Sequence, residues 1–225
     1  MTDEYTPGHY DKSIKNNSPL PILKNFRWER YFTRPLASLI VKAVFRTSIT
    51  PNQLTYFSFF LGLGAGAAYC VGTHFYFIIG GILTQLGSIF DCADGQLARA
   101  KNLQSRYGTY LDLFLDRISD TLVLFCMNWG YYRYSGEKAL FILGLITLAL
   151  YNLQVVLYYM VKQYYGKDDL GDRAEARGFA IFLILVTSVF NRLNLMILTI
   201  FVMTILNIGY RLVIFLGKAR QQPPS

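Results

Sequence analysis

The chain has 225 residues, of which 53% are hydrophobic and only 16% charged, and its formal net charge is +8. Soluble domains are about 45–50% apolar and about 25% charged, so these proportions exclude a disordered chain and argue against an ordinary cytosolic enzyme. The ranges 47–90 and 139–161 contain no Lys, Arg, Asp or Glu, which predicts helices that face lipid.

The surplus of basic residues has two interpretations. A nucleic-acid-binding protein would gather Lys and Arg on one face, whereas here they fall between apolar stretches. That distribution is typical of the positive-inside bias of membrane proteins. We therefore expect a lipid bilayer, and no nucleic acid, as a partner.

The N-terminal region precedes the long apolar stretches. Residues 1–24 are predicted to form a polar tail. Residues 25–47 mix Arg and Lys with aromatic side chains, which predicts an amphipathic juxtamembrane helix on the membrane surface. Pro35 can only begin or break a helix there. Residues 48–220 are predicted to form one transmembrane domain, followed by a short tail at 221–225.

Thr50 and Pro51 form a helix-start signal, and Gly72, Thr73 and His74 supply a turn within the uncharged run. The predicted fold is an all-α integral membrane bundle of six transmembrane helices with the N-terminal surface helix. The six predicted spans are 52–71, 75–102, 105–134, 138–163, 176–191 and 194–217. Lys and Arg concentrate at both termini and near residues 103 and 170, which places these parts in the cytoplasm.

Two pairs of aspartates lie on consecutive predicted helices. Asp91 and Asp94 are three residues apart, and Asp112 and Asp116 are four apart, so each pair projects from one helix face. A hairpin turn near residues 103–104 brings Asp91 level with Asp116 and Asp94 near Asp112. The four carboxylates then meet roughly 15 Å from the turn, at 1.5 Å per helical residue.

Four anions near lipid repel one another and stay ionised only when cations neutralise them. Oxygen ligands suit hard ions such as Mg²⁺, Mn²⁺ or Ca²⁺, and two such ions could clamp a phosphate chain. Gly95, Ala98 and Gly108 leave room for a ligand against the backbone, and Arg99 is placed to contact phosphate. A lone pair of aspartates at the end of a span could be merely interfacial, but the complete set favours a functional site.

The spacing D-x2-D-G-x2-A-R-x8-G-x3-D-x3-D resembles the signature of the CDP-alcohol phosphotransferases, or CDP-alcohol phosphatidyltransferases. Its fixed positions are Asp91, Asp94, Gly95, Ala98, Arg99, Gly108, Asp112 and Asp116. The resemblance implies that 48–220 is a catalytic domain. Its reaction would transfer the phosphoalcohol group of a CDP-alcohol, typically a CDP-lipid, to an acceptor hydroxyl with release of CMP, in phospholipid biosynthesis.

The resemblance also implies roles for the motif residues. Asp91, Asp94 and Asp112 would be metal ligands, and Asp116 would be the general base and a ligand to a second metal. The CDP-binding set would comprise Asp91, Asp94, Gly95, Ala98, Arg99, Gly108 and Asp112. The expected cofactors are two Mg²⁺ or Mn²⁺ ions, and the expected assembly is a homodimer.

The acceptor is less constrained by the sequence. Lys162, Arg177 and Arg211 are expected at the cytoplasmic ends of the last three spans, where they could bind an acceptor such as an inositol phosphate or glycerol phosphate. The same cations could equally reflect the positive-inside bias. The run from Gly108 to Arg117 resembles the branch of the family that uses inositol phosphate, while a serine, choline or ethanolamine-type partner remains an alternative.

Two other classes of protein use clustered carboxylates. A cation or solute transporter could bind its cargo there, but the acids lie near one surface and no inverted repeat is visible. A metal-dependent prenyl or pyrophosphate enzyme would need further aspartate clusters. For the transferase we expect a cell inner membrane, or the ER membrane in a eukaryote, with the active site and both termini cytoplasmic.

Overall fold

The computed structural model describes residues 28–165 and 173–219, and all regular secondary structure in that part of the chain is helical. The all-α prediction is therefore confirmed, while both predicted tails, at 1–24 and 221–225, lie outside the described residues. The elements are η1 (Glu29–Thr33), α2 (Arg34–Val44), α3 (Pro51–Val71), α4 (His74–Ala100), α5 (Arg106–Ser135), α6 (Lys138–Tyr165), α7 (Arg173–Val189) and α8 (Leu193–Ala219).

Local hydrogen bonds explain where the helices begin. The Thr50 hydroxyl accepts from the Gln53 backbone N–H, the Gln53 side chain accepts from the Thr50 N–H, and Pro51 occupies the first turn of α3. Gly72, at a φ of +73°, ends that helix in the left-handed region. The Ser105 hydroxyl caps α5 by accepting from the backbone N–H of Gly108 at 3.0 Å.

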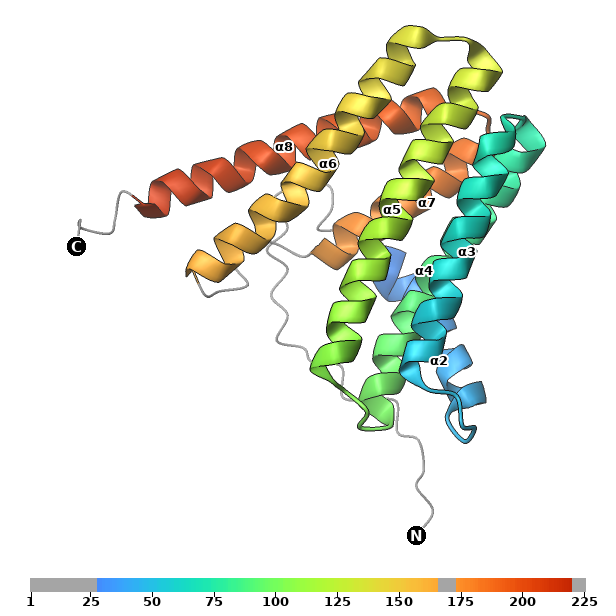
Figure 1. Ribbon diagram of the computed structural model, residues 1–225, viewed down its shortest axis with the longest axis vertical. Coiled ribbons are helices and arrows are strands. Elements are labelled where there is room, and N and C mark those ends of the chain that lie inside the picture. The colour runs from blue at the N-terminus through green and yellow to red at the C-terminus, as the bar shows by residue number, and fades with distance from the viewer. Residues whose placement is uncertain (1–27, 166–172, 220–225) are drawn as a thin grey trace.

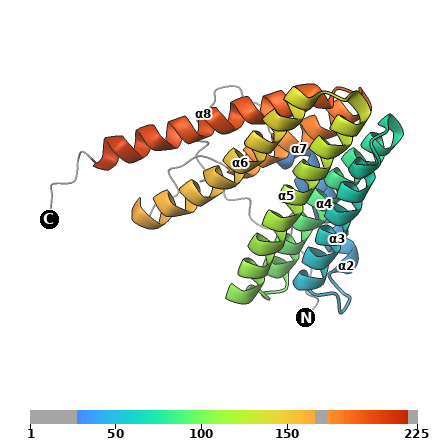
Figure 2. The same cartoon turned by 45° about the horizontal axis from the view of Figure 1, so that its top comes forward.

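The helices form a bundle that opens on one side (Figure 1). α3 packs against α4 and α5, and α4 also packs against α7. α6 contacts α5 and α8. From the turn between α5 and α6, α6 diverges from α5 and runs alongside α8 (Figures 1 and 2). Residues of α5, α6, α7 and α8 line a cavity on this side of the bundle.

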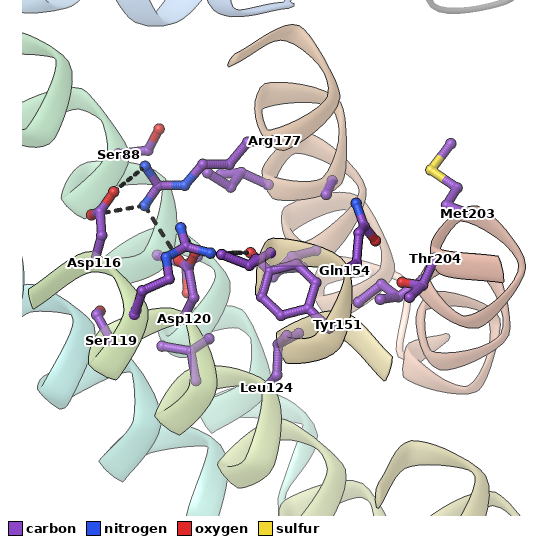
Figure 3. Close-up of a pocket in the computed structure, with 18 of the residues that line it drawn as sticks. Ser88, Asp116, Ser119, Asp120, Leu124, Tyr151, Gln154, Arg177, Met203 and Thr204 are labelled. Carbon is purple, nitrogen blue, oxygen red and sulfur yellow. Dashed lines mark hydrogen bonds and ion pairs between the residues drawn. The ribbon is translucent and has the colours of Figure 1, made fainter. Parts of the chain in front are cut away.

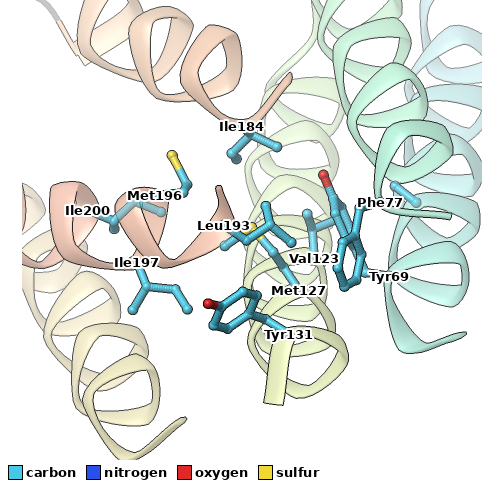
Figure 4. Packing of buried hydrophobic residues seen from close by; sticks show 11 residues of the cluster. Tyr69, Phe77, Val123, Met127, Tyr131, Ile184, Leu193, Met196, Ile197 and Ile200 are labelled. Atoms are coloured by element: carbon cyan, nitrogen blue, oxygen red, sulfur yellow. The ribbon is translucent and has the colours of Figure 1, made fainter. Parts of the chain in front are cut away.

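The main apolar core joins five helices, α3, α4, α5, α7 and α8 (Figure 4). Tyr69 and Phe77 are fully buried in it, and the Tyr69 hydroxyl lies 2.9 Å from the Ser188 hydroxyl. Gly80 permits this packing, because a Cβ there would lie 2.7 Å from the Tyr69 ring. Gly130 similarly allows the backbones of α3 and α5 to touch, since its Cβ would collide with the Tyr69 carbonyl.

A smaller core attaches α2 to α4 through the buried side chains of Ala37 and Val41. Ser38 donates to the Gln96 side chain at 2.9 Å, which links the same two helices. Pro35 lies in the first turn of α2, as its fixed φ requires. Leu39 is 60% exposed on the other face, so α2 is amphipathic, and its contact with a membrane surface stays a prediction.

Four helices in the described part of the chain are long and apolar enough to cross a membrane: α3, α4, and the segments Lys138–Met160 and Leu193–Val213. The protein is thus a multi-pass membrane protein. α5 carries several charged residues, and the apolar part of α7, Arg177–Val189, is shorter than a full span. The count of six spans therefore stays a prediction, although all six helices lie where it placed them.

Candidate active site

Three of the predicted aspartates meet between α4 and α5. Asp91, Asp112 and Asp116 each offer a carboxylate oxygen, and these oxygens lie within 4.8 Å of one another. We call these residues the three-carboxylate group. The side chains of Asp91 and Asp116 are only 19% and 18% exposed. The α4–α5 hairpin therefore brings together residues 91 and 116, as the helical register predicts.

Asp94 has an additional partner that the sequence did not predict. Its side chain is buried, and its Oδ2 accepts a 2.6 Å hydrogen bond from the Thr55 hydroxyl of α3. Among the described residues, the three-carboxylate group does not include it. Asp94 lies about one turn beyond Asp91 on the same face of α4. No motif or spacing in the sequence indicates Thr55 as a site residue.

The small residues of the motif keep the backbone of this hairpin open. Gly95 faces the Arg99 guanidinium, which lies 3.5 Å from the position of a Cβ at Gly95. A Cβ at Gly108 would lie 3.1 Å from the Ser105 hydroxyl and 3.2 Å from the Asn52 side chain. Ala98 is half-buried on α4 between these features. A side chain at Gly108 would therefore crowd Ser105 and Asn52, whereas one at Gly95 would make ordinary contact with Arg99.

The three predicted acceptor-binding cations have separate positions. Arg177, from α7, lies directly on the three-carboxylate group: its Nη1 donates to Asp91 at 3.0 Å and to Asp116 at 2.8 Å. Its Nη2 donates to the other Asp116 oxygen at 3.0 Å. Arg211, on α8, is buried and donates to the Gln154 carbonyl at 2.8 Å. Lys162 belongs to α6, but its side chain lies outside the described residues.

A second polar network adjoins the first on α5 (Figure 3). Asp120 accepts from the Tyr151 hydroxyl and from Arg117, both at 2.9 Å, and from Arg177 at 3.3 Å. The sequence could have indicated Asp120, because it continues the four-residue spacing of Asp112 and Asp116. Nothing in the sequence pointed to Tyr151, since it comes from α6 and reaches the site only through the packing of α6 on α5.

A cavity of about 350 Å³ opens beside both networks. One wall carries polar side chains, including Asp116, Arg117, Asp120, Tyr151 and Arg177. Gln154 and Thr204 (Figure 3) and Arg211 also line the cavity. The apolar part of the lining comes from α5, α6, α7 and α8. A polar ligand of modest size therefore fits next to the carboxylates.

The three-carboxylate group fits a divalent cation. Its ligand atoms are oxygens, which hard ions such as Mg²⁺ and Mn²⁺ prefer. The Asp112 Oδ1 is buried and has no hydrogen-bond partner among the described residues. Asp91 and Asp116 share the single positive charge of Arg177, so negative charge remains to be neutralised. A cation between these residues would satisfy both the charge and the unpaired oxygen.

The sequence profile of the CDP-alcohol phosphatidyltransferases matches residues 48–215, which is most of the chain. The chain belongs to the CDP-alcohol phosphatidyltransferase family. The resemblance expected from the motif is thereby confirmed. The protein is a metal-dependent transferase of phospholipid biosynthesis, which moves the phosphoalcohol group of a CDP-alcohol to an acceptor hydroxyl with release of CMP. The transporter and pyrophosphate-enzyme alternatives are set aside.

Relatives of known activity support this membership. The archaetidylinositol phosphate synthase of Pyrococcus horikoshii is 30% identical over 162 residues, which cover 69% of this chain and 78% of the relative. The phosphatidylinositol phosphate synthase of Corynebacterium glutamicum is 33% identical over 148 residues, which cover 65% of this chain but only 59% of the relative. Both relatives act in the synthesis of inositol phosphate lipids, as their names state.

Solved structures of the phosphatidylinositol phosphate synthase of Mycobacterium tuberculosis share the fold. The form with CDP-DAG bound has a TM-score of 0.65 and 21% sequence identity, over 80% of this chain and 92% of that protein. The form in complex with manganese and citrate also has a TM-score of 0.65, at 21% identity, over 78% and 87% of the two chains. The family fold is therefore present in this chain.

Proposed function

We propose that the chain transfers the phosphatidyl-type group of a CDP-linked lipid to a hydroxyl of a phosphorylated polyol, of the inositol phosphate class. The observation that carries this is the arginine-bearing wall of the cavity beside the three-carboxylate group. The Nε atoms of Arg117 and Arg177 are buried there without a hydrogen-bond partner in the described part of the chain. Buried donors of this kind indicate an acceptor group, such as phosphate, that completes the site.

The named relatives support the same choice, because both are synthases of inositol phosphate lipids. Glycerol phosphate is the second phosphorylated acceptor that this wall would suit. The serine, choline and ethanolamine alternatives use the same chemistry, but they offer no phosphate to the arginines. We therefore rank them below the phosphorylated polyols.

We further propose that Asp91, Asp94, Asp112 and Asp116 hold two Mg²⁺ or Mn²⁺ ions. These ions would neutralise the charge of the CDP pyrophosphate and orient it for attack. Gly95, Ala98 and Gly108 would let the CDP group approach the backbone, and Arg99 would contact its phosphates. The family motif and the unpaired Asp112 oxygen support these roles.

Asp116 is proposed as the general base that removes the proton from the attacking hydroxyl. It lies on the cavity wall, where the acceptor would enter. Both its oxygens accept from Arg177 in the present arrangement. A proton taken up by Asp116 would remove the charge that holds Arg177 and so weaken this ion pair. The released guanidinium would then be available to the acceptor phosphate, since it lies on the same wall.

The protein is further proposed to act as a homodimer in a cell inner membrane, or in the ER membrane of a eukaryote. The active site and both termini would face the cytoplasm, which the distribution of Lys and Arg supports. The domain division at residues 48 and 220 is part of the same proposal.

An acceptor panel tests the proposed function directly. The purified full-length protein in detergent is incubated with radiolabelled CDP-diacylglycerol, Mg²⁺ or Mn²⁺, and one acceptor at a time. The acceptors are inositol phosphate, glycerol phosphate, free inositol and serine. We expect lipid product with a phosphorylated acceptor and none with its unphosphorylated counterpart. Product with serine alone would contradict the proposal.

A further inference from the structure

Asp120 is a fifth acidic residue at the site, and it lies outside the family motif. It follows Asp116 by one helical turn on α5, and its side chain is only 20% exposed. Three donors converge on it. Tyr151 and Arg117 both bind its Oδ2 at 2.9 Å, and Arg177 binds its Oδ1 at 3.3 Å. Such a network fixes the carboxylate, because rotation would break hydrogen bonds on both oxygens.

Arg177 bridges this network and the three-carboxylate group. Among the described residues, its Nη1 donates to members of that group alone, at 3.0 Å to Asp91 and 2.8 Å to Asp116. Its Nη2 donates to both Asp116 and Asp120. A divalent cation between the carboxylates would compete for the Asp91 and Asp116 oxygens and would repel the guanidinium. Asp120 binds Nη2 whereas Asp91 binds Nη1, and Asp120 is not part of the three-carboxylate group. A cation held by that group would therefore leave the Asp120 contact in place.

We propose that Asp120 is a positioning residue that keeps Arg177 on the cavity wall when the three-carboxylate group holds its cation. The tethered guanidinium then faces the cavity and binds the acceptor phosphate. Tyr151 and Arg117 hold Asp120 in this orientation, because both bind its Oδ2, whereas Arg177 binds its Oδ1. This inference rests on the proposed function, in which the acceptor carries a phosphate. It adds Asp120 as a residue that sets the affinity for this acceptor.

The test is the substitution Asp120→Asn in the full-length protein. This substitution preserves the shape of the side chain and removes its charge. We expect KM for inositol phosphate to rise about tenfold, as loss of a charge-assisted contact implies. KM for CDP-diacylglycerol and the affinity for Mn²⁺, followed by electron paramagnetic resonance, should change less than the acceptor KM, because Asp120 reaches the three-carboxylate group only through Arg177 among the described residues. Asp120→Glu keeps the charge and should recover part of the acceptor affinity.

A second variant keeps the test decisive if Asp120→Asn fails to fold. Tyr151→Phe removes one of the three donors and should raise the acceptor KM in the same selective way, by about threefold. An unchanged acceptor KM would overturn the proposal. So would a parallel loss of donor and Mn²⁺ affinity, which would indicate a merely structural role. Failure of the proposed function would give a different result from failure of the Asp120 proposal. In that case the unsubstituted protein itself would prefer acceptors without phosphate.

Discussion

The contact between Thr55 and Asp94 offers a sharp test of how the site is organised. Both side chains are buried, with exposed fractions of 7% and 5%, and the Thr55 hydroxyl donates to Asp94 at 2.6 Å. Thr55→Val replaces the hydroxyl with a methyl group of similar size. The Asp94 carboxylate then loses a donor that water cannot readily replace.

Hydrogen bonds to charged groups contribute about 1.5–3 kcal/mol. If this contact orients Asp94 for the reaction, its loss lowers kcat/KM for the CDP-lipid by about 10- to 150-fold, at about 1.4 kcal/mol per factor of ten. The assay is CMP release by the purified protein at saturating acceptor and Mn²⁺. The expected loss in kcat/KM is large because the hydrogen bond between Thr55 and Asp94 is both buried and short.

Thr147→Val is the matched control. Thr147 is also buried, but its hydroxyl donates to the Leu143 carbonyl of its own helix, α6. Its substitution removes the same atoms without touching a carboxylate, so kcat/KM should stay within about twofold. If Thr55→Val behaved like Thr147→Val, Asp94 would not depend on α3 and the reasoning would be refuted.

Three further predictions concern the base, the acceptor wall and the packing. Asp116→Asn should abolish turnover yet leave CDP-lipid binding largely intact, as measured by equilibrium binding, and undiminished turnover would remove its role as the base. Arg177→Ala and Arg211→Ala should each raise the acceptor KM by about tenfold, and an unchanged KM in both would exclude an anion-binding wall. Gly130→Ala should lower Tm in detergent, because its Cβ would collide with the α3 backbone and overpacking costs about 1–3 kcal/mol. Gly209→Ala is its control, since a Cβ there meets nothing within 4 Å, and an equal Tm for both variants would contradict the packing argument.

The helices could be predicted well because membrane spans leave strong local signals. Uncharged stretches, the Thr50–Pro51 start and the turn at Gly72 placed α3 and α4 within three residues of their ends. The meeting of Asp91 and Asp116 could also be predicted, because a short hairpin fixes the register of two adjacent helices. These inferences depend on sequence neighbours only.

Contacts between helices distant in the sequence could not be predicted. Arg177 was expected in an acceptor pocket, and the structure places it on Asp91 and Asp116 through the packing of α7 against α4. The hydrogen bond that Asp94 accepts from Thr55 of α3 was likewise not predicted. Such choices depend on side-chain geometry across helix interfaces, which no periodicity or spacing encodes.

The central claim is that Asp91, Asp112 and Asp116 gather around a divalent cation. The most direct measurement is the anomalous scattering of Mn²⁺ in crystals of the protein grown with that ion. The account predicts an anomalous peak bounded by these three carboxylates, and its loss in the Asp112→Asn protein. A peak elsewhere, or none at this position while Mn²⁺ supports turnover, would contradict it.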